Sequence, residues 1–395
     1  MNVSGNILLK KGREQSVLRK HPWVFSGALQ QLTSSGQDGN WVKVCDSKGL
    51  TLGFGHYQNG SIAVRMLSFG EEQPADTFWK DKINRALTLR HAVGLPSEKT
   101  NAFRLIHGEG DGLPGLIIDF YAGVAVIQAH SAGMHNDREQ IAQALKVAMG
   151  EQLSAIYYKS RATLPGKIKE DQPDGYLLGM GVVPHVIHEH GNKFLVDWES
   201  GQKTGFFLDQ RENRKLLGDF SKGKNVLNTF CYTGGFSVYA LKADASLVHS
   251  VDASEKAIDI TRKNIELNGY DPQQHECTAI DTFEFLKNKQ GVYDLIVLDP
   301  PAFAKHRDAR HQAVKGYQRL NAEAMKVIRP GGIIFTFSCS QVVDKQLFYD
   351  TVTSAAIQAE REVKVLHLLS QPSDHPVSMN HPEGEYLKGL VLYVV

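Results

Sequence analysis

Residues 224–254, KNVLNTFCYTGGFSVYALKADASLVHSVDAS, contain a strand-forming run, a Gly-containing turn, a helix-forming run and a second strand-forming run. This order is typical of a βαβ unit, in which two parallel strands are joined by a crossover helix. The alternation continues to the C-terminus, with helices expected at 255–269, 282–289, 310–328 and 345–360 and strands at 275–281, 293–301, 329–340, 363–369 and 387–395. Residues 186–395 are therefore predicted to form an α/β domain with a mostly parallel sheet wrapped by helices.

The preceding residues predict two further domains. Residues 1–72 contain short strand-forming runs separated by Gly and polar residues, which is typical of a small β-barrel; the runs are 23–29, 41–47, 50–57 and 61–67. Residues 73–185 begin with a helical pattern, continue into a strand hairpin and end with another helix and strand, at 76–93, 116–129, 136–149 and 155–161. This pattern predicts a central α+β linking domain.

The composition indicates a soluble globular protein. Hydrophobic residues make up 42% and charged residues 22% of the 395 residues, which does not fit a disordered chain. The first residues do not resemble a signal peptide, and no apolar run is long enough for a transmembrane helix. The four cysteines are widely spaced and form no CxxC pair, which argues against a zinc site and against a disulfide framework, and we expect no metal ion. We expect a cytoplasmic protein that does not bind a membrane.

Basic residues cluster in two segments, although the formal net charge of the whole chain is only +1. Residues 1–22 contain one acidic residue, Glu14, and five basic residues, which are Lys10, Lys11, Arg13, Arg19 and Lys20. Residues 305–319 contain one acidic residue, Asp308, and five basic residues, which are Lys305, Arg307, Arg310, Lys315 and Arg319. Local basic patches on a near-neutral protein fit a site for one particular RNA, but two solvated faces explain them equally well.

The carboxyl ends of the predicted strands suggest a cofactor site, because ligands bind there in open α/β sheets. The first turn has a Gly pair that permits close approach of a ligand, but it lacks the GxGxxG spacing of diphosphate sites. Asp252 could bind both hydroxyls of a ribose, and Asp281 could accept from an adenine amino group. S-adenosylmethionine, a nucleoside cofactor without a diphosphate, fits this set. The expected contacts are Asn228, Phe230, Tyr232, Thr233, Gly234, Asp252, Asp281 and Asp299. Each Asp taken alone is more typical of a helix N-cap or turn.

The fourth strand ends in Asp299-Pro300-Pro301, followed by Phe303. The two prolines fix the backbone and remove two amide donors, so that Asp299 is expected to point into the crevice. Phe303 could flank a planar base. Loops of this type serve methyltransferases that act on the ring or amino group of a nucleobase, and the alternative is a rigid turn with a capping Asp.

The fifth strand ends in Ser338-Cys339-Ser340. A thiolate at the substrate crevice can add to carbon 6 of a pyrimidine, which makes carbon 5 nucleophilic enough to accept a methyl group. Lys305 is a candidate cation for favouring the thiolate, and the two serines are candidate substrate contacts. The alternative for Cys339 is a small buried hydrophobe, which is the commonest state of a cysteine outside disulfides and the interpretation that we prefer for Cys45, Cys231 and Cys277.

Two smaller features leave alternatives open. HEHG, residues 188–191, places two histidines two positions apart without a partner cluster, so we expect a strand or loop with exposed rings rather than a metal site. Residues 202–214, QKTGFFLDQRENR, precede the first strand of the α/β domain. Asp209, Gln210 and Arg211 in this segment either close over the cofactor or only begin a helix.

Seven motifs together resemble those of a bacterial family of RNA methyltransferases; they are HPWVFSGAL, GEGDGLPGLIID, KTGFFLDQR, NTFCYTGGFSVYA, LDPPAF, FSCS and HPEGEYLKG. The likeness runs from about residue 8 to the C-terminus. It implies an N-terminal PUA domain that binds RNA, a central linking domain and a Rossmann-like domain that binds S-adenosylmethionine. It also implies 5-methylcytosine formation in 23S rRNA, with Cys339 as the nucleophile and Asp299 orienting the base.

The resemblance raises Gln210 and Arg211 to expected cofactor contacts and suggests a homodimer. Comparable RNA enzymes carry a second cysteine in the loop after the fourth strand, where this chain has DPPAF, so product release must be assisted otherwise. Some family members have Lys after DPP, where this chain has Ala302. The rival functions are methylation of a base nitrogen without covalent catalysis and a non-catalytic role in ribosome assembly.

Overall fold

The computed structural model describes residues 3–32, 37–164, 166, 173–287, 291–304 and 306–395. Contacts divide the chain into two compact units. The first contains Met1–His185, Val196–Phe206 and Ser373–Gly384, and the second contains Val186–Leu195, Phe207–Pro372 and Glu385–Val395. The domain bounds 1–72, 73–185 and 186–395 stay predictions. Among the helices of the described residues, none has the length and hydropathy needed to cross a membrane.

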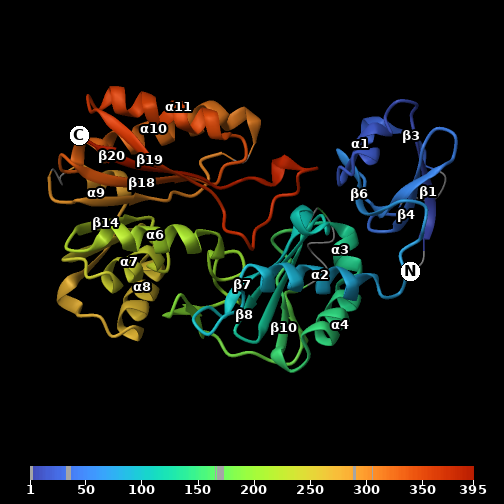
Figure 1. Cartoon of the computed structure of the whole chain (residues 1–395), viewed down its shortest axis with the longest axis horizontal. Coiled ribbons are helices and arrows are strands. Elements are labelled where there is room, and N and C mark those ends of the chain that lie inside the picture. The colour runs from blue at the N-terminus through green and yellow to red at the C-terminus, as the bar shows by residue number, and fades with distance from the viewer. Residues whose placement is uncertain (1–2, 33–36, 165, 167–172, 288–290, 305) are drawn as a thin grey trace. The chain divides into compact units, whose positions relative to one another are not determined.

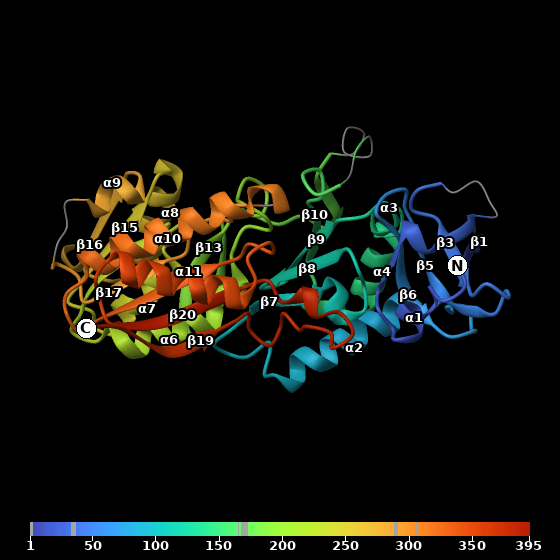
Figure 2. The same ribbon diagram turned by 90° about the horizontal axis from the view of Figure 1, so that it is seen from above.

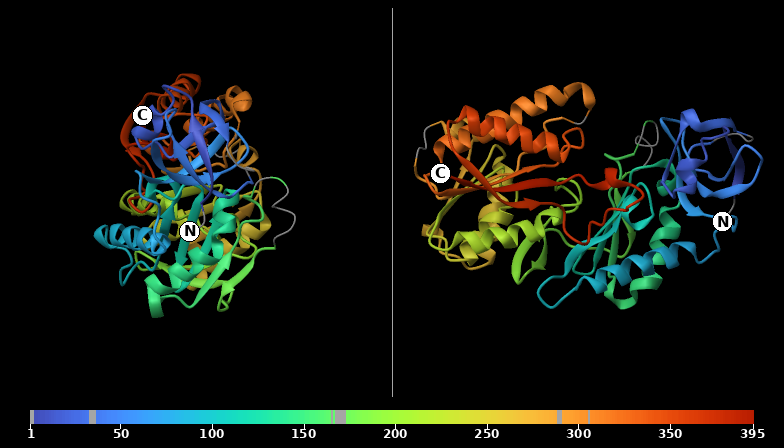
Figure 3. Two further views of the ribbon diagram at one scale, coloured as in Figure 1. Left: turned by 90° about the vertical axis from the view of Figure 1, so that its right-hand side faces the viewer. Right: turned by 45° about the horizontal axis from the view of Figure 1, so that its top comes forward.

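The first part of unit 1 is a six-stranded, nearly closed barrel sheet in the order β2-β6-β5-β4-β1-β3, seen as a curled sheet in Figure 3. Its elements are β1 (Val3–Leu9), α1 (Gln15–Leu18), β2 (Trp23–Phe25), β3 (Leu29–Leu32), β4 (Trp41–Cys45), β5 (Thr51–Tyr57) and β6 (Ile62–Phe69). Alternating apolar side chains fill its interior, among them Ile7, Val44 and Val64, none of which is exposed. The predicted barrel is confirmed. Strand β1 was not predicted, because Ser4, Gly5 and Asn6 weaken its strand pattern.

The central part of unit 1 is a five-stranded sheet in the order β11-β10-β9-β8-β7. Its strands are β7 (Ala102–His107), β8 (Leu116–Tyr121), β9 (Val124–Ala129), β10 (Ala155–Tyr158) and β11 (Gly175–Leu178), and its helices are α2 (Phe78–Ala92), α3 (Ala132–Asn136) and α4 (Arg138–Met149). Helices α2 and α4 pack against each other, as Figure 2 shows. Trp41, Phe54 and Leu67 of the barrel belong to the same hydrophobic core as this sheet, so the two parts of unit 1 share one interior.

Two segments from later in the chain complete unit 1. In 373–384, Asp374 is fully buried; its carbonyl accepts from Arg90 at 2.9 Å and its carboxylate from the amide of Arg104 at 2.9 Å. In 196–206, the hydroxyl of Thr204 donates to Asp119 at 2.6 Å, and Trp198 is fully buried. No sequence pattern indicated these two excursions, because each is a short irregular segment whose partners are remote in sequence.

Unit 2 is built around a seven-stranded sheet in the order β16-β15-β14-β17-β18-β20-β19. In chain order its elements are α6 (Arg211–Ser221), β14 (Asn225–Thr229), α7 (Gly235–Lys242), β15 (Leu247–Asp252), α8 (Glu255–Leu267), β16 (His275–Ala279), α9 (Thr282–Leu286), β17 (Leu295–Leu298), α10 (Arg310–Val327), β18 (Gly332–Ser338), α11 (Lys345–Gln358), β19 (Val363–Leu369) and β20 (Lys388–Val394). A hairpin of β12 (His185–Glu189) and β13 (Asn192–Val196) precedes them. Helices α6, α7 and α8 cover one face of the sheet and α10 and α11 the other (Figure 1). The predicted mostly parallel α/β fold is confirmed.

The strand order places one edge of the sheet where a ligand can bind. Strands β14, β15, β16, β17 and β18 are parallel, so their carboxyl ends lie along the same edge. The order reverses beside β14, whose neighbours are β15 and β17, and such a switch point opens a crevice between the connecting helices. Strand β20 runs antiparallel to β18, with Lys388 opposite Ser338. The first residue of β20 therefore lies at the same edge as the last residues of the parallel strands.

Candidate active site

The turn between β14 and α7 is held in a strained conformation. Phe230 and Tyr232 have positive φ values of 53° and 47°, which cost energy in residues with a side chain. Tyr232 is held from both sides: its amide donates to Asp252 Oδ2 at 3.0 Å, and its carbonyl accepts from Thr261 at 3.0 Å. Gly234 has a φ of 73°, and a Cβ there would lie 2.6 Å from Thr261 Cγ2. The turn is thus preorganised, as a site for a bound nucleoside requires.

Asp252 and Asp281 both serve as turn or capping residues. Asp252 is the last residue of β15 and accepts from the amide of Ser254 at 2.9 Å in addition to that of Tyr232. Asp281 lies two residues beyond the end of β16 and caps α9, because its Oδ1 accepts from Phe283 at 2.9 Å and Glu284 at 3.1 Å. The expectation that the third strand ends at Asp281 is corrected, since the strand ends at Ala279. Their cofactor contacts stay predictions.

Asn228 lies inside β14 and is buried, with 1% of its surface exposed. Its Nδ2 donates to Ser237 at 2.9 Å, while its Oδ1 has no hydrogen-bond partner among the described residues. A buried acceptor without a partner costs free energy unless a ligand or water satisfies it. Thr233, in the adjoining turn, is also buried, and its carbonyl accepts from Asn264.

The segment before α6 reaches the end of the fourth strand. Gln210 Nε2 donates to Asp299 Oδ2 at 3.0 Å, and Gln210 Oε1 accepts from Asn213 at 2.6 Å. Asp299 follows directly after Leu298, the last residue of β17. Arg211 is buried and its Nε donates to Glu212 at 3.1 Å. The structure therefore brings Gln210 and Asp299 together, although they are remote in sequence, and leaves the cofactor contact of Arg211 a prediction.

The loop after β17 is anchored on α10. Pro300 is buried and Pro301 is exposed. The ring of Phe303 lies with its centroid 4.7 Å from that of Tyr317, at an angle of 53°, and it contacts Gly316 closely. Burial raises the pKa of Tyr317 to about 12, so its hydroxyl stays protonated beside Cys339 and Asp299. Phe303 is therefore held in place by the protein itself, and its contact with a base stays a prediction.

Cys339 is the first residue after β18, at the strand end where the strand count placed it, and its side chain is half-buried. The serines beside it are almost fully buried: the Oγ of Ser340 donates to the carbonyl of Ala304 at 2.7 Å, and Ser338 Oγ accepts from the amide of Ser340 at 3.3 Å. The bond from Ser340 to Ala304 joins the loops that follow the fourth and fifth strands. The serines thus position Cys339, and their predicted contact with a substrate is not needed to explain them.

Lys388, the first residue of β20, was missed by the sequence analysis. It is 4% exposed, and its Nζ donates to the carbonyl of Ser340 at 2.7 Å. Burial lowers its pKa from 10.5 to about 8, while Cys339 and two nearby carboxylates act in the opposite direction. Lys388 is therefore a buried cation next to Cys339 at neutral pH. Lys305, the cation predicted for this place, lies outside the described residues.

The other cysteines differ from Cys339 in their surroundings. Cys45 is buried in the barrel. Burial raises the pKa of the Cys231 thiol far above its usual value and that of Cys277 to about 11. Thiols in such environments are poor nucleophiles at neutral pH, which agrees with the structural roles predicted for them.

The five basic residues of the N-terminal segment are all exposed and lie between β1 and β2 around α1; they are Lys10, Lys11, Arg13, Arg19 and Lys20. In the second basic segment, Arg319 stacks on Phe283 at 4.1 Å and Arg310 pairs with Asp344 at 3.6 Å. The two segments thus differ: the first presents cations to solvent, and part of the second is engaged within the protein.

In the HEHG segment, Glu189 is fully buried and forms a two-point ion pair with Arg214, with N–O distances of 2.7 Å. His188 and His190 are half-buried rather than exposed as predicted. This segment therefore joins the β12–β13 hairpin to α6.

Comparison with known proteins agrees with this architecture. Residues 103–388 match the S-adenosylmethionine-dependent methyltransferase family, and residues 7–69 match the PUA-like domain family. The chain is 41% identical over 397 residues to ribosomal RNA large subunit methyltransferase I of Aeromonas hydrophila, covering 99% of each chain. It also resembles, at 22% identity and a TM-score of 0.83, a proposed S-adenosylmethionine-dependent methyltransferase of Streptococcus mutans, covering 98% of this chain and 100% of that one. A methyltransferase structure in complex with SAH gives a TM-score of 0.85 at 22% identity, with the same coverage.

Proposed function

Because the chain belongs to the S-adenosylmethionine-dependent methyltransferases that carry a PUA-like domain, we propose that it methylates carbon 5 of a cytosine in 23S rRNA. The name of the Aeromonas hydrophila relative points to RNA of the large ribosomal subunit. The observation that carries the choice of atom is the position of Cys339, directly after β18 and beside the buried cation Lys388. The protein would act in the cytoplasm.

The residues at the sheet edge fit the cofactor. S-adenosylmethionine supplies the methyl group when it is bound. Asp252 ends β15, where a carboxylate suits the ribose hydroxyls. The buried Oδ1 of Asn228 offers an acceptor to a donor of the ligand. Phe230, Tyr232, Thr233 and Gly234 form the strained turn after β14, whose backbone would contact the cofactor.

Cys339 adds as a thiolate to carbon 6 of the cytosine and forms a carbon–sulfur bond, which makes carbon 5 an enamine carbon. After carbon 5 has accepted the methyl group, a base removes its proton, and the carbon–sulfur bond breaks to return the thiolate. Lys388 favours the thiolate electrostatically, as nearby cations do for reactive cysteines. Asp299, oriented by Gln210, holds the cytosine and stabilises its protonated ring nitrogen. The base must leave its stack to reach these groups.

The exposed cations of the first 22 residues supply contacts to RNA phosphates. Each phosphate contact that releases a counterion steepens the dependence of affinity on salt. Removing the charges of Lys10, Lys11 and Arg13 should therefore weaken RNA binding and flatten its salt dependence.

The proposed function is tested on large-subunit rRNA from cells that lack the protein. Incubation with the purified enzyme and S-adenosylmethionine is expected to add one methyl group at a single cytosine, seen by mass mapping of nuclease fragments. A methyl group on a base nitrogen would overturn the proposed chemistry. Cofactor binding without methylation of any rRNA would favour an assembly factor.

Replacing Lys388 by methionine should lower methyl transfer at pH 7 by roughly ten- to a hundredfold, because the thiolate of Cys339 loses its neighbouring cation. In the wild type, Lys388 loses its proton near pH 8. We therefore expect the single-turnover rate of the wild type to fall above about pH 8. The rate of the variant should show no such fall.

The pH dependence of the free energy of unfolding is the control, because a purely structural role of Lys388 would appear in this quantity rather than in the rate. The unfolded chain binds the Lys388 proton up to about pH 10.5 and the folded chain only up to about 8, so this residue makes stability rise with pH across that window. The methionine variant should lose this rise. Lys364→Met removes an exposed lysine of β19 that pairs with Glu362 at 3.5 Å, and it should leave the rate profile unchanged. An unchanged profile in Lys388→Met would refute the assignment.

A further inference from the structure

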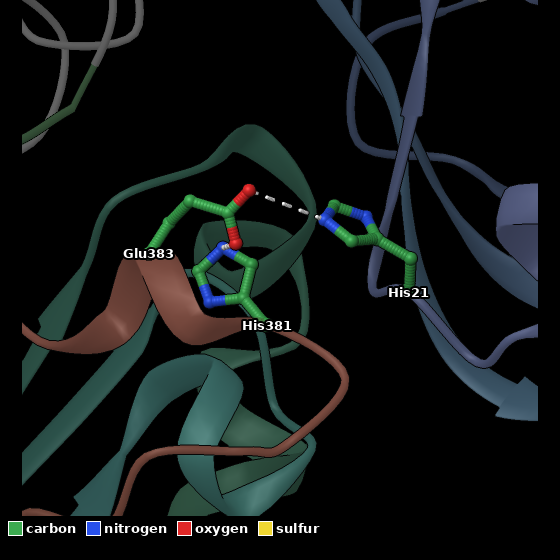
Figure 4. Close-up of side chains that lie close together, drawn as sticks. All are labelled: His21, His381 and Glu383. Atoms are coloured by element: carbon green, nitrogen blue, oxygen red, sulfur yellow. Dashed lines mark ion pairs between the residues drawn. The ribbon is translucent and has the colours of Figure 1, made fainter.

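Two histidines and a glutamate from opposite ends of the chain meet in unit 1. His21 precedes β2 of the barrel, and His381 and Glu383 flank Pro382 in a short turn of the 373–384 segment (Figure 4). Nε2 of His21 lies 3.9 Å from Glu383 Oε1, and Nε2 of His381 lies 3.9 Å from Glu383 Oε2. One ligand atom of each residue lies within 4.8 Å of the others.

His381 is the residue in this cluster that requires an explanation. It is only 3% exposed, and neither of its ring nitrogens has a hydrogen-bond partner among the described residues. Its distance of 3.9 Å to Glu383 is too long for a hydrogen bond. The ring packs edge-on against Trp23, with centroids 4.4 Å apart. Two buried nitrogens without partners are costly unless a ligand satisfies one of them.

His21 is already oriented as a ligand. The backbone of Trp23 holds its Nδ1, with the carbonyl oxygen at 3.2 Å and the amide nitrogen at 3.1 Å. The amide of Trp23 donates to Nδ1, so the ring proton lies on Nε2, the nitrogen that faces Glu383. When a metal ion displaces that proton, the Trp23 carbonyl at 3.2 Å from Nδ1 can accept from a proton carried there. Metal-bound histidines are commonly fixed in this way by a carbonyl on their other nitrogen.

The charges around the cluster favour a cation. Glu109 and Glu383 both act on His381 as negative charges. Glu109 also accepts from Trp23 Nε1 at 3.0 Å, which ties it to the same site.

We propose that His21, His381 and Glu383 bind a divalent transition-metal ion, with Zn²⁺ the cation that the donor set suits best. Two imidazoles and a carboxylate are typical zinc ligands, and three protein ligands leave one position for water. Zinc bonds of about 2.0–2.2 Å place tetrahedral ligands about 3.3 Å apart, so the donor atoms must close by roughly an ångström. Glu383, whose side chain is 57% exposed, can rotate to bring its carboxylate closer to both histidines.

The ion would join the N-terminal barrel to the 373–384 segment, because it takes one ligand from the first and two from the second. The sequence does not indicate this metal site through HEHG or through a CxxC spacing, because the three ligands become adjacent only after folding. The motifs HPW and HPEG, which the catalytic site does not use, supply all three ligands.

The test uses the full chain after treatment with a chelator and titration with Zn²⁺ or Co²⁺ alone. We expect one ion per chain with a dissociation constant in the micromolar range or below. The Co²⁺ form should show the absorption of a tetrahedral site without a thiolate charge-transfer band, which separates this site from the cysteines. Zn²⁺ should also raise the unfolding temperature, because it binds the folded state.

Glu383→Gln and His21→Gln should each weaken Zn²⁺ binding at least tenfold, and His381→Gln should do the same. Because the Glu383 side chain is exposed, its replacement should leave the fold intact even if the replacement of the buried His381 does not. His367→Gln, which removes an exposed histidine of β19, is the matched control and should bind Zn²⁺ like the wild type. The proposal is overturned if the wild type binds no ion at micromolar concentrations, or if Glu383→Gln and His21→Gln bind it unchanged.

Discussion

Replacing Cys339 by alanine is expected to abolish methyl transfer, with a loss of at least about a thousandfold in the single-turnover rate, because the reaction loses its nucleophile. Cofactor binding should stay within a few-fold of the wild type, since Cys339 follows β18 and is not among the expected cofactor contacts, most of which lie in β14, in the turn after it and at the end of β15. Calorimetry with S-adenosylmethionine and a radiolabelled methyl transfer assay on rRNA measure the two effects separately.

The covalent step can be seen directly. With RNA that carries 5-fluorocytosine, carbon 5 has no proton to lose, so the wild type should remain attached to the RNA through a bond that survives denaturing electrophoresis. Cys339→Ala should form no such complex. Cys277→Ser is the matched control, because the pKa of Cys277 is about 11 and its thiol is not expected to react. Wild-type rates in Cys339→Ala would exclude covalent catalysis and point to a nitrogen of the base.

Replacing Asp299 by asparagine is expected to lower the single-turnover rate by roughly a hundred- to ten-thousandfold, the range in which a positioned acid or base contributes. The asparagine keeps the shape and can still accept from Gln210, which donates to Asp299 at 3.0 Å. The loss would therefore report the missing negative charge that stabilises the protonated cytosine. Rates measured at saturating RNA and cofactor isolate this effect from binding.

Asp294→Asn is a control from the other end of the same strand. Asp294 pairs with Arg329 at 2.9 Å and accepts from the amide of Asn225 at 2.9 Å, just before β17 begins. Its replacement should cost about 1–3 kcal/mol of stability, as for a charged hydrogen-bonded group, without changing the rate of the folded enzyme. If Asp299→Asn loses only stability and no rate, Asp299 is a structural capping residue.

The fold of unit 2 was predictable because its strand-forming and helix-forming segments have different hydrophobic patterns. The apolar run of β17 is buried at every position, as expected for a central parallel strand. The long helix expected at 310–328 is α10, Arg310–Val327. Counting strands then placed Asp252, Asp299 and Cys339 at one edge of the sheet, and the register confirmed it.

The errors and omissions arise where a local sequence pattern carries no information about the direction of a strand or about partners that are distant in the sequence. Lys388 was missed because only the carboxyl ends of parallel strands were considered, whereas the antiparallel β20 brings its amino end to the same edge. Asp281 was placed on a strand because HECTAID is apolar enough to continue, but its carboxylate caps α9 instead. The bond between Gln210 and Asp299 depends on tertiary packing, and no spacing in the sequence encodes it.

The two excursions of the chain mean that the halves of this protein are not separable genetic modules. A fragment ending at residue 185 would lack Asp374, leaving a fully buried arginine, Arg90, without one of its acceptors and the amide of Arg104 without its carboxylate. The complementary fragment would carry 196–206 and 373–384 with nothing to fold against. Recombination that exchanges unit 1 between relatives must therefore transfer three separate stretches of the chain together, so the two units are constrained to be inherited as one piece.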